Sequence, residues 1–159
     1  MHQILLRFAD SSDIKNVFEL SNSSFVRNNS INNKEILWNE HVEWFKNELN
    51  NKKNYFYIIE TADKEFIGQL RLKFIQDNEY IISITMLKEF QKQRIGTISL
   101  QKLFSIHKNY DFIAYIKEDN MLSQVFFEKN KFYKDGIIEL NNNIFFIYKR
   151  KHHEHNSNL

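Results

Sequence analysis

The stretch FQKQRIGTISL, residues 90–100, joins an apolar run to a helix-like run through a turn of amides and cations. A helix start exposes unpaired N–H groups and the positive end of the helix dipole, which together attract anions such as phosphate. No acidic residue lies between Glu89 and Asp111 to compete for these N–H groups. Gly96, one of three glycines, lacks a Cβ and lets a ligand approach the backbone. The stretch predicts a strand, a turn and a helix around a pyrophosphate, with a solvated basic turn as the alternative.

The composition limits both the fold and the partners. Hydrophobic residues make up 42% of the 159 residues and aromatic residues 15%, enough for one compact domain over residues 1–150. The net charge of +2 argues against a general nucleic-acid binder. Cysteine is absent, which excludes disulfides and a thiolate nucleophile. No stretch has the layout of a signal peptide or a membrane span, so we expect a cytoplasmic protein.

Residues 151–159, KHHEHNSNL, form a polar end that we expect to be a disordered tail. His152, His153 and His155 are possible metal ligands, but no framework of cysteines or carboxylates accompanies them. We interpret them as a solvated basic end and expect no metal.

The hydrophobic periodicity predicts alternating strands and helices. Strands are expected at residues 4–8, 55–59, 66–74, 80–87, 112–116, 137–140 and 144–149, and helices at 13–20, 34–49, 96–107 and 120–130. The polar stretch 21–33 is expected to be a loop. The three strands between residues 55 and 87 are separated by short turns, which indicates an antiparallel meander.

The helix predicted at residues 120–130 has an aromatic residue outside its apolar face. Leu122, Val125 and Phe126 follow helical spacing and are predicted to face the core. The opposite face is predicted to carry Asn120, Ser123 and Phe127. Phe127 then needs either a second packing contact or a ligand.

These two stretches resemble the acyl-CoA signature of the GNAT superfamily of N-acetyltransferases. In the pattern Q/R-x-x-G-x-G/A, Gln91 matches the first position and Gly96 the last, while Arg94 stands where the first glycine is usual. The order of elements also matches from residue 4 to residue 149. The resemblance implies an α+β fold with a mostly antiparallel sheet of about six or seven strands and helices on both faces. It also implies direct acetyl transfer from acetyl-CoA to an amine.

The resemblance further implies the residues of the acetyl-CoA site. They are Thr85, Met86, Leu87, Gln91, Lys92, Gln93, Arg94, Ile95, Gly96, Thr97, Asn120, Ser123 and Phe127. A backbone N–H within Thr85–Leu87, centred on Met86, is expected to hold the oxyanion. Phe127 replaces a tyrosine that often protonates the leaving thiolate, and a phenyl ring has no proton to donate. Water or the substrate does so instead, or the thiolate leaves unprotonated.

The candidate general base is His41, at the edge of the apolar face of the helix predicted at residues 34–49. The ordinary pKa of a histidine suits proton transfer near neutral pH. The alternative is a packed histidine with a structural role. Glu40 and Glu79 are weaker candidates, because exposed acidic residues are most often only solvated charges.

The stretches NNSINNKEILWNEHVEWFKNEL and IGQLR resemble a bacterial subgroup linked to pseudaminic and related nonulosonic-acid synthesis. That subgroup acetylates the amine of a nucleotide-linked amino sugar. The resemblance implies that Asn29, Trp44, Gln69 and Arg71 bind the acceptor, with Arg71 or Arg27 near a diphosphate. Ile81 replaces a glutamate of these relatives, and their W-R-N-D sequence is absent.

Three alternatives for function stay open at this stage. The acceptor is a small-molecule amine, or it is a protein, peptide or antibiotic amine, or the chain is a degenerate module that binds CoA or a partner without catalysis. We expect a monomer or a homodimer, with no nucleic-acid or membrane partner. A nucleotide sugar requires a closed basic pocket, whereas a peptide requires an open groove.

Overall fold

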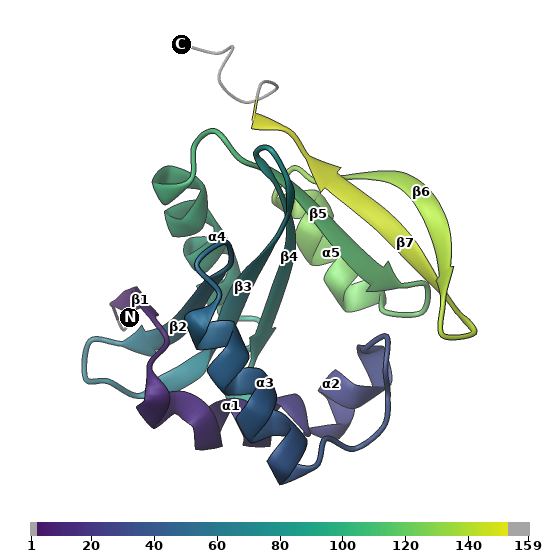
Figure 1. Ribbon diagram of the computed structural model, residues 1–159. Coiled ribbons are helices and arrows are strands. Elements are labelled where there is room, and N and C mark those ends of the chain that lie inside the picture. Colours follow the sequence, from purple (N-terminus) through teal and green to yellow (C-terminus); the bar gives the residue numbers. More distant parts are fainter. Residues whose placement is uncertain (1–2, 153–159) are drawn as a thin grey trace.

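A computed structural model describes residues 3–152 as one seven-stranded sheet between two layers of helices (Figure 1). The strands are β1 (Ile4–Phe8), β2 (Tyr55–Thr61), β3 (Phe66–Gln76), β4 (Glu79–Met86), β5 (Asp111–Lys117), β6 (Tyr133–Leu140) and β7 (Asn143–Arg150). The helices are α1 (Ile14–Ser21), α2 (Ser24–Asn29), α3 (Trp38–Asn50), α4 (Ile95–Ile106) and α5 (Met121–Lys129). Short 3-10 turns, Ser11–Asp13 and Lys88–Phe90, precede α1 and α4.

The strand order is β1-β2-β3-β4-β5-β7-β6. All neighbouring strands are antiparallel except β4 and β5, which are parallel. This parallel pair needs a crossover connection, and α4 supplies it. The predicted α+β fold with about seven, mostly antiparallel strands is confirmed, and so is the meander of β2, β3 and β4.

The N-terminal helices depart from the prediction. Residues 24–29 form α2, where the sequence predicted a loop, because a six-residue helix with one buried apolar residue, Val26, shows no periodicity. The next helix begins at Trp38 and not at residue 34. The segment before it is held extended by Asn22, whose side chain bonds both the N–H and the carbonyl of Ile36, at 2.8 and 2.9 Å.

Each face of the sheet has its own core. The larger core lies under α4 and α5 and includes Leu100, Leu103 and Phe127 against strand residues such as Leu70 and Leu72. The smaller core lies under α1 and α3. Its buried members are Val17, Phe45, Phe56 and Ile58. The sheet face under α1 and α3 therefore buries fewer apolar side chains than the face under α4 and α5.

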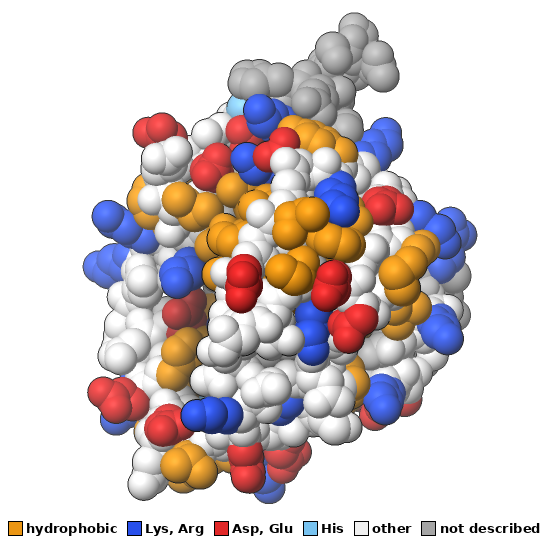
Figure 2. Space-filling view, turned by 90° about the vertical axis from the view of Figure 1, so that its right-hand side faces the viewer, with side chains coloured by type: hydrophobic (Ala, Val, Ile, Leu, Met, Phe, Trp, Pro, Cys, Tyr) orange, Lys and Arg blue, Asp and Glu red, His pale blue; other side chains and the backbone are white. Residues whose placement is uncertain are grey.

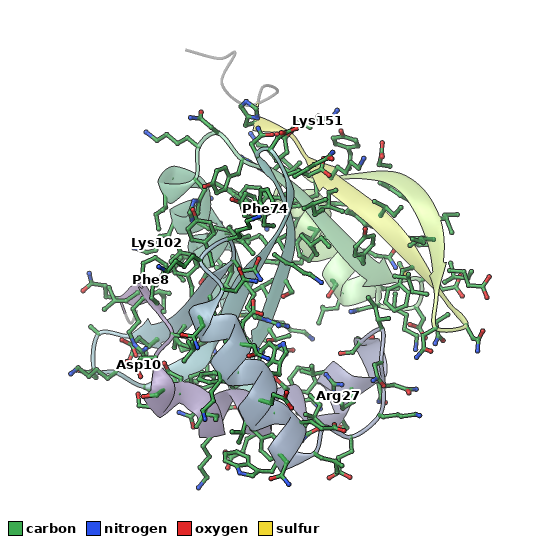
Figure 3. All side chains as sticks on the ribbon, viewed as in Figure 1. Phe8, Asp10, Arg27, Phe74, Lys102 and Lys151 are labelled. Atoms are coloured by element: carbon green, nitrogen blue, oxygen red, sulfur yellow. The ribbon has the colours of Figure 1, made fainter. Side chains whose placement is uncertain are left out.

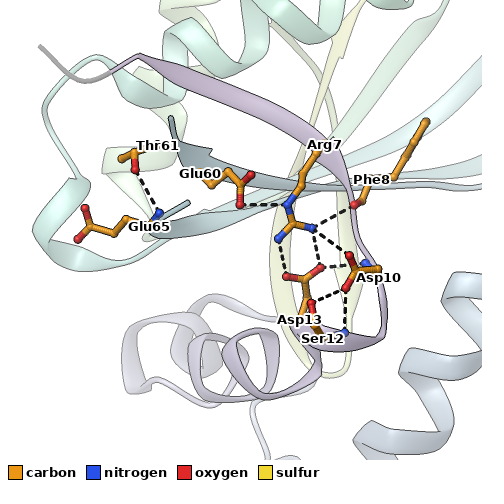
Figure 4. Close-up of polar contacts among 8 residues, drawn as sticks. All are labelled: Arg7, Phe8, Asp10, Ser12, Asp13, Glu60, Thr61 and Glu65. Atoms are coloured by element: carbon orange, nitrogen blue, oxygen red, sulfur yellow. Dashed lines mark hydrogen bonds and ion pairs between the residues drawn. The ribbon is translucent and has the colours of Figure 1, made fainter. Parts of the chain in front are cut away.

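A charged cluster fixes the start of the chain to the sheet (Figure 4). Arg7 on β1 donates two hydrogen bonds of 2.8 Å to Asp13, and its Nε lies 3.0 Å from a carboxylate oxygen of Glu60 on β2. Asp13 and Glu60 are both buried. Removing one partner of such a buried pair leaves a costly unpaired charge. The cluster thus holds the turn that starts α1 against β2.

The face that β6 and β7 present carries apolar side chains among charged ones (Figure 2). Ile137 on β6 is 61% exposed, and Lys149 and Asp135 form an ion pair of 3.0 Å across the two strands. In the part of the chain that the structure describes, no helix combines the length and the apolar character needed to cross a bilayer. Of the predicted tail, residues 153–159 lie outside the described residues. His152 departs from the expected solvated end, because its Nδ1 lies 2.7 Å from a carboxylate oxygen of Asp111.

Candidate active site

A gap between β4 and β5 is the central feature of the site. The two strands pair only between Glu79–Ile81 and Asp111–Ile113. Farther along, β5 pairs with β7, while β4 continues to Met86 with β3 alone. One edge of β4 is therefore unpaired after Ile81, and the backbone groups along it are open to a ligand.

The backbone of Met86 points into this gap. Leu87 donates its N–H to Ile67 at 2.9 Å, and Gly68 lies opposite Met86 in the β3–β4 ladder. Because hydrogen-bonded and non-bonded pairs alternate in an antiparallel ladder, the N–H and C=O of Met86 are directed away from β3. The Met86 carbonyl accepts a hydrogen bond from Gln91 Nε2 at 3.2 Å, which agrees with this direction. Within Thr85–Leu87, the Met86 N–H is thus the group that faces the gap.

The start of α4 leaves its N–H groups without a side-chain cap. Its first turn contains no acidic residue, as the sequence predicted. Arg94 precedes the helix with φ 64°, and Lys92 has φ 59°. This left-handed backbone favours glycine, so Arg94 adopts the conformation that explains the usual glycine of the GNAT signature. The uncapped helix start fits the pyrophosphate of acetyl-CoA.

Gly96 is needed for packing between helices. A Cβ at Gly96 would lie 2.9 Å from Cε2 of Phe126 on α5 and 3.5 Å from Cε of Met86. The position of a Cβ at Gly96 therefore faces Phe126 and Met86, and the approach of acetyl-CoA to the Gly96 backbone stays a prediction. The glycine lets α5 and the end of β4 come close to the start of α4.

Side chains of the predicted cofactor residues brace the loop. Gln93 Nε2 donates to the carbonyl of Glu89 at 2.7 Å, and Gln91 reaches Met86 as described. Thr97 Oγ1 accepts a hydrogen bond from Asn130 Nδ2 at 3.2 Å, which ties α4 to the end of α5. These contacts hold the loop in place, while the helix start that follows it has no side-chain cap.

The orientation of α5 departs from the prediction at two of the three residues expected to face the core, whereas Phe126 packs against the larger core as expected. Leu122 and Val125 are exposed, at 57% and 45%, whereas Phe127 is buried at 5% in the larger core. Asn120 caps the helix by accepting the N–H of Ser123 at 3.3 Å. The hydrophobic spacing alone could not decide the orientation, because apolar residues occupy both faces of this short helix. Phe127 is a packing residue, and its contact with a CoA arm stays a prediction.

The sheet face covered by α1 and α3 brings together three of the four predicted acceptor residues, Trp44, Gln69 and Arg71. Gln69 and Arg71 are two positions apart on β3 and point to the same face. The guanidinium carbon of Arg71 lies 4.9 Å from the ring centre of Trp44 on α3. Gln69 donates to Ser21 Oγ at 3.3 Å. Asn29 is exposed and donates to Phe25 within α2, so the described contacts do not join it to this group.

His41 is a buried link between α1 and α3. His41 is only 2% exposed, and its Nε2 lies 2.8 Å from the carbonyl oxygen of Ile14. Phe18, Trp38, Trp44 and Phe45 surround the imidazole ring. Burial lowers the pKa of His41, although the contact with Ile14 opposes the shift. This packing removes the geometric support for His41 as the general base, and favours the structural alternative.

Two features of this face could not be read from the sequence. Arg27 lies on α2 (Figure 3), and its guanidinium donates to the carbonyls of Ser21, Asn32 and Lys34. The interpretation that Arg27 holds a diphosphate therefore loses support, because these donors are engaged. Ser21, the partner of Gln69, stood in a segment expected to be a loop. No local pattern marks either contact.

Comparison with known proteins identifies the type of protein to which this fold and site belong. The sequence matches the Acetyltransferase (GNAT) family over residues 14–132. The chain belongs to this family of acetyltransferases, whose acyl donor is acetyl-CoA. No curated protein matches the sequence. Among residues 3–152, no group of three or more histidine, aspartate or glutamate side chains is arranged to hold a metal ion.

Solved structures share the fold at low sequence identity. A spermidine N-acetyltransferase from Vibrio cholerae, in complex with CoA and spermine, is 15% identical with a TM-score of 0.81, covering 92% of this chain and 93% of that one. A ribosomal L7/L12 alpha-N-protein acetyltransferase in complex with coenzyme A is 20% identical, with a TM-score of 0.80 and 93% coverage of both chains. An N-acetyltransferase from Staphylococcus aureus Mu50 is 16% identical, with a TM-score of 0.76, covering 94% of this chain and 98% of that one.

Proposed function

We propose that the protein transfers an acetyl group from acetyl-CoA to the primary amine of a small molecule, and that this amine belongs to an amino sugar carried on a nucleotide. The observation that carries the proposal is the unpaired edge of β4 beside the uncapped start of α4. Met86 joins the two, because its carbonyl bonds Gln91 and its methyl group lies near Gly96.

The donor side would hold acetyl-CoA mainly through its backbone. The N–H groups at the start of α4 would hold the pyrophosphate, and the Met86 N–H would hold the carbonyl oxygen on which negative charge develops. Acetyl-CoA supplies an activated thioester. The chain contains no cysteine, so an acyl-cysteine intermediate is not available, which agrees with the direct transfer that the resemblance implies. The new N–C bond forms as the C–S bond breaks, and CoA leaves with the thiolate electron pair.

The proton of the attacking amine is passed to water in this proposal. His41 is buried against Ile14, and Phe127 has no proton to exchange. An amine that is already neutral needs no protein base to start the reaction. The amine of an amino sugar is less basic than a lysine or polyamine amine, because electron-withdrawing oxygens surround it. This supports a sugar amine as the acceptor.

The arrangement of Trp44, Gln69 and Arg71 also supports a sugar nucleotide. These residues come from two separate stretches that resemble the amino-sugar subgroup, and they lie together in the structure. An indole ring can stack on a sugar or a base, and an amide can bond hydroxyl groups. The resemblance of the sequence and the proximity in space are independent observations.

The first experiment is calorimetric titration of the purified protein with acetyl-CoA, followed by a thiol-release assay with a panel of amines. We expect micromolar binding, a free energy of about −8 kcal/mol, and turnover with an amino-sugar nucleotide. Absence of binding at millimolar acetyl-CoA would overturn the proposed function. Binding without turnover on any amine would instead identify a CoA-binding module.

A further inference from the structure

Three buried polar atoms without a hydrogen-bond partner lie on β3 and β4. They are Gln69 Oε1, Arg71 Nε and Thr85 Oγ1. In the strand register Gln69 lies directly opposite Thr85, and Arg71 is on the same face of β3, two residues farther along. A buried polar group without a partner is costly, and native proteins contain few of them. Three such atoms at neighbouring positions indicate a place where a ligand supplies the missing partners.

Arg71 gives this place a positive charge. It forms no ion pair within the described part of the chain. Glu48 attracts it from α3, but one oxygen of that carboxylate accepts a hydrogen bond from Asn54 at 3.1 Å. Burial lowers the pKa of Arg71, yet a guanidinium stays charged in proteins. The nearby Arg27 adds repulsion, so the charge of Arg71 is poorly balanced.

Trp44 and Phe56 hold the guanidinium in one orientation. Its carbon lies 4.9 Å from the ring centre of Trp44 and 6.0 Å from that of Phe56. A cation stacked on aromatic rings keeps its N–H edge free for a planar or tetrahedral oxyanion. Gln69, which is 3% exposed, places an unused acceptor, Oε1, two residues away. An amine or hydroxyl group of the same ligand would satisfy that oxygen.

From these contacts we propose that the side chains of Gln69, Arg71 and Thr85 select an acceptor whose carrier bears an oxyanion, paired by Arg71, and reject polyamines. This inference rests on the proposed function and adds to it the residue that would recognise the charge of the carrier. A polyamine has several positive charges, and this face offers it two arginines, with Glu48 partly engaged elsewhere. A phosphate or a carboxylate on the carrier would supply the missing partner of Arg71.

The test compares acceptors of different net charge. Glucosamine, glucosamine 6-phosphate, glucosaminic acid and spermidine are assayed at saturating acetyl-CoA with the wild-type protein, Arg71→Gln and Arg71→Lys. Lys73→Gln is the matched control, because Lys73 is an exposed cation on the same strand. For the wild type we expect kcat/KM to be highest for an anionic sugar and lowest for spermidine. The phosphate and carboxylate members of the series show which oxyanion is recognised.

We expect Arg71→Gln to lower kcat/KM for the preferred anionic acceptor by about 100-fold and to leave acetyl-CoA affinity unchanged. Arg71→Lys should restore part of the loss, and Lys73→Gln should change it less than about twofold, as for a surface charge. If spermidine is the best acceptor, or if Arg71→Gln alters all acceptors equally, the proposal is wrong and the three atoms are satisfied by internal water. If the wild-type protein does not bind acetyl-CoA at all, the proposed function itself is overturned.

A second readout does not depend on turnover. With saturating CoA present to occupy the donor side, inorganic pyrophosphate should raise the melting temperature of the wild type and of Lys73→Gln. It should not raise that of Arg71→Gln. An equal shift in all three proteins would contradict an oxyanion site at Arg71.

Discussion

The two faces of the sheet serve the same proposed reaction with different kinds of chemical groups. On the donor side, the groups available to a ligand are backbone N–H groups, at Met86 and at the start of α4. On the acceptor side, they are side-chain atoms of Gln69, Arg71 and Thr85. A backbone cradle tolerates changes of side chain, whereas a side-chain pocket does not. The comparison suggests that donor binding is robust to most substitutions and that acceptor choice is sensitive to single ones.

The largest effect is expected where the two sides meet, at Gly68. A Cβ there would overlap the carbonyl oxygen of Thr85 and lie 2.9 Å from Cα of Met86. These are backbone atoms, which cannot turn aside, so Gly68→Ala must separate β3 from β4. We expect a loss of about 3 kcal/mol in the free energy of unfolding, measured with urea, at the upper end of the usual overpacking range. Turnover should be lost as the Met86 N–H shifts.

Gly136 provides the control for this change. A Cβ at Gly136 would meet only Cδ1 of Ile147, at 3.7 Å, which is an ordinary contact. Gly136→Ala should therefore be neutral or stabilise the protein by about 0.5 kcal/mol through the unfolded chain. If both alanine variants behave alike, the close approach of β3 and β4 at Gly68 is not what the glycine provides.

How far the sequence could predict the molecule also differs between the two faces. The donor side follows from local patterns, since a strand, a basic turn and a helix are consecutive in the chain. The acceptor side depends on long-range contacts. The 2.8 Å contact of His41 with Ile14 spans 27 residues, and that of Gln69 with Ser21 spans 48. Hydrophobic spacing located α5, but it could not show that Leu122 is exposed and Phe127 buried.

His41 tests whether the acceptor side contains a hidden base. We expect His41→Gln, which keeps a donor for Ile14, to cost about 2 kcal/mol through lost packing and a poorer hydrogen bond. Its pH–rate profile with the best acceptor should keep the wild-type shape. A loss of the acidic limb of the profile, where the rate falls as a general base becomes protonated, with the melting temperature preserved, would mean that His41 acts in proton transfer.

The same variant has a defined effect on stability against pH. Burial lowers the pKa of His41 in the folded state, so the unfolded state binds the proton first as the pH falls. The contribution of neutral His41 to the free energy of unfolding is fully present above the ordinary pKa of about 6.5 and is lost as the pH falls below it. His41→Gln should therefore show a shallower loss of stability between pH 7 and pH 5, as read from urea midpoints. Some slope should remain, because burial also lowers the pKa of His107.

Substitutions at Thr85 and Thr61 would compare a hydroxyl proposed to face a ligand with a hydroxyl that has a structural role. Thr85 Oγ1 has no partner, whereas Thr61 Oγ1 accepts the N–H of Glu65 at 3.1 Å (Figure 4). Thr85→Val removes an unsatisfied group and should stabilise the protein by about 1 kcal/mol while lowering kcat/KM for the acceptor. Thr61→Val should destabilise by about 1 kcal/mol without changing the ratio of activities between acceptors. Destabilisation by Thr85→Val would show that its hydroxyl already has a partner.

The smallest effect is expected at Arg94, where the donor side departs from the GNAT signature. Arg94 has φ 64°, a conformation that costs an ordinary residue about 1 kcal/mol and glycine almost nothing. Arg94→Gly should raise the free energy of unfolding by about 0.5 kcal/mol, after the entropy that glycine adds to the unfolded chain. Lys64→Gly is the control, because Lys64 has φ 66° in the turn between β2 and β3, far from α4 in the sequence. Both variants should gain similar stability.

Calorimetric affinity for acetyl-CoA should change less than about threefold in Arg94→Gly, as expected when an exposed side chain contributes little. A loss of tenfold or more would show that the guanidinium itself holds the pyrophosphate, and the donor side would then depend on a side chain as the acceptor side does.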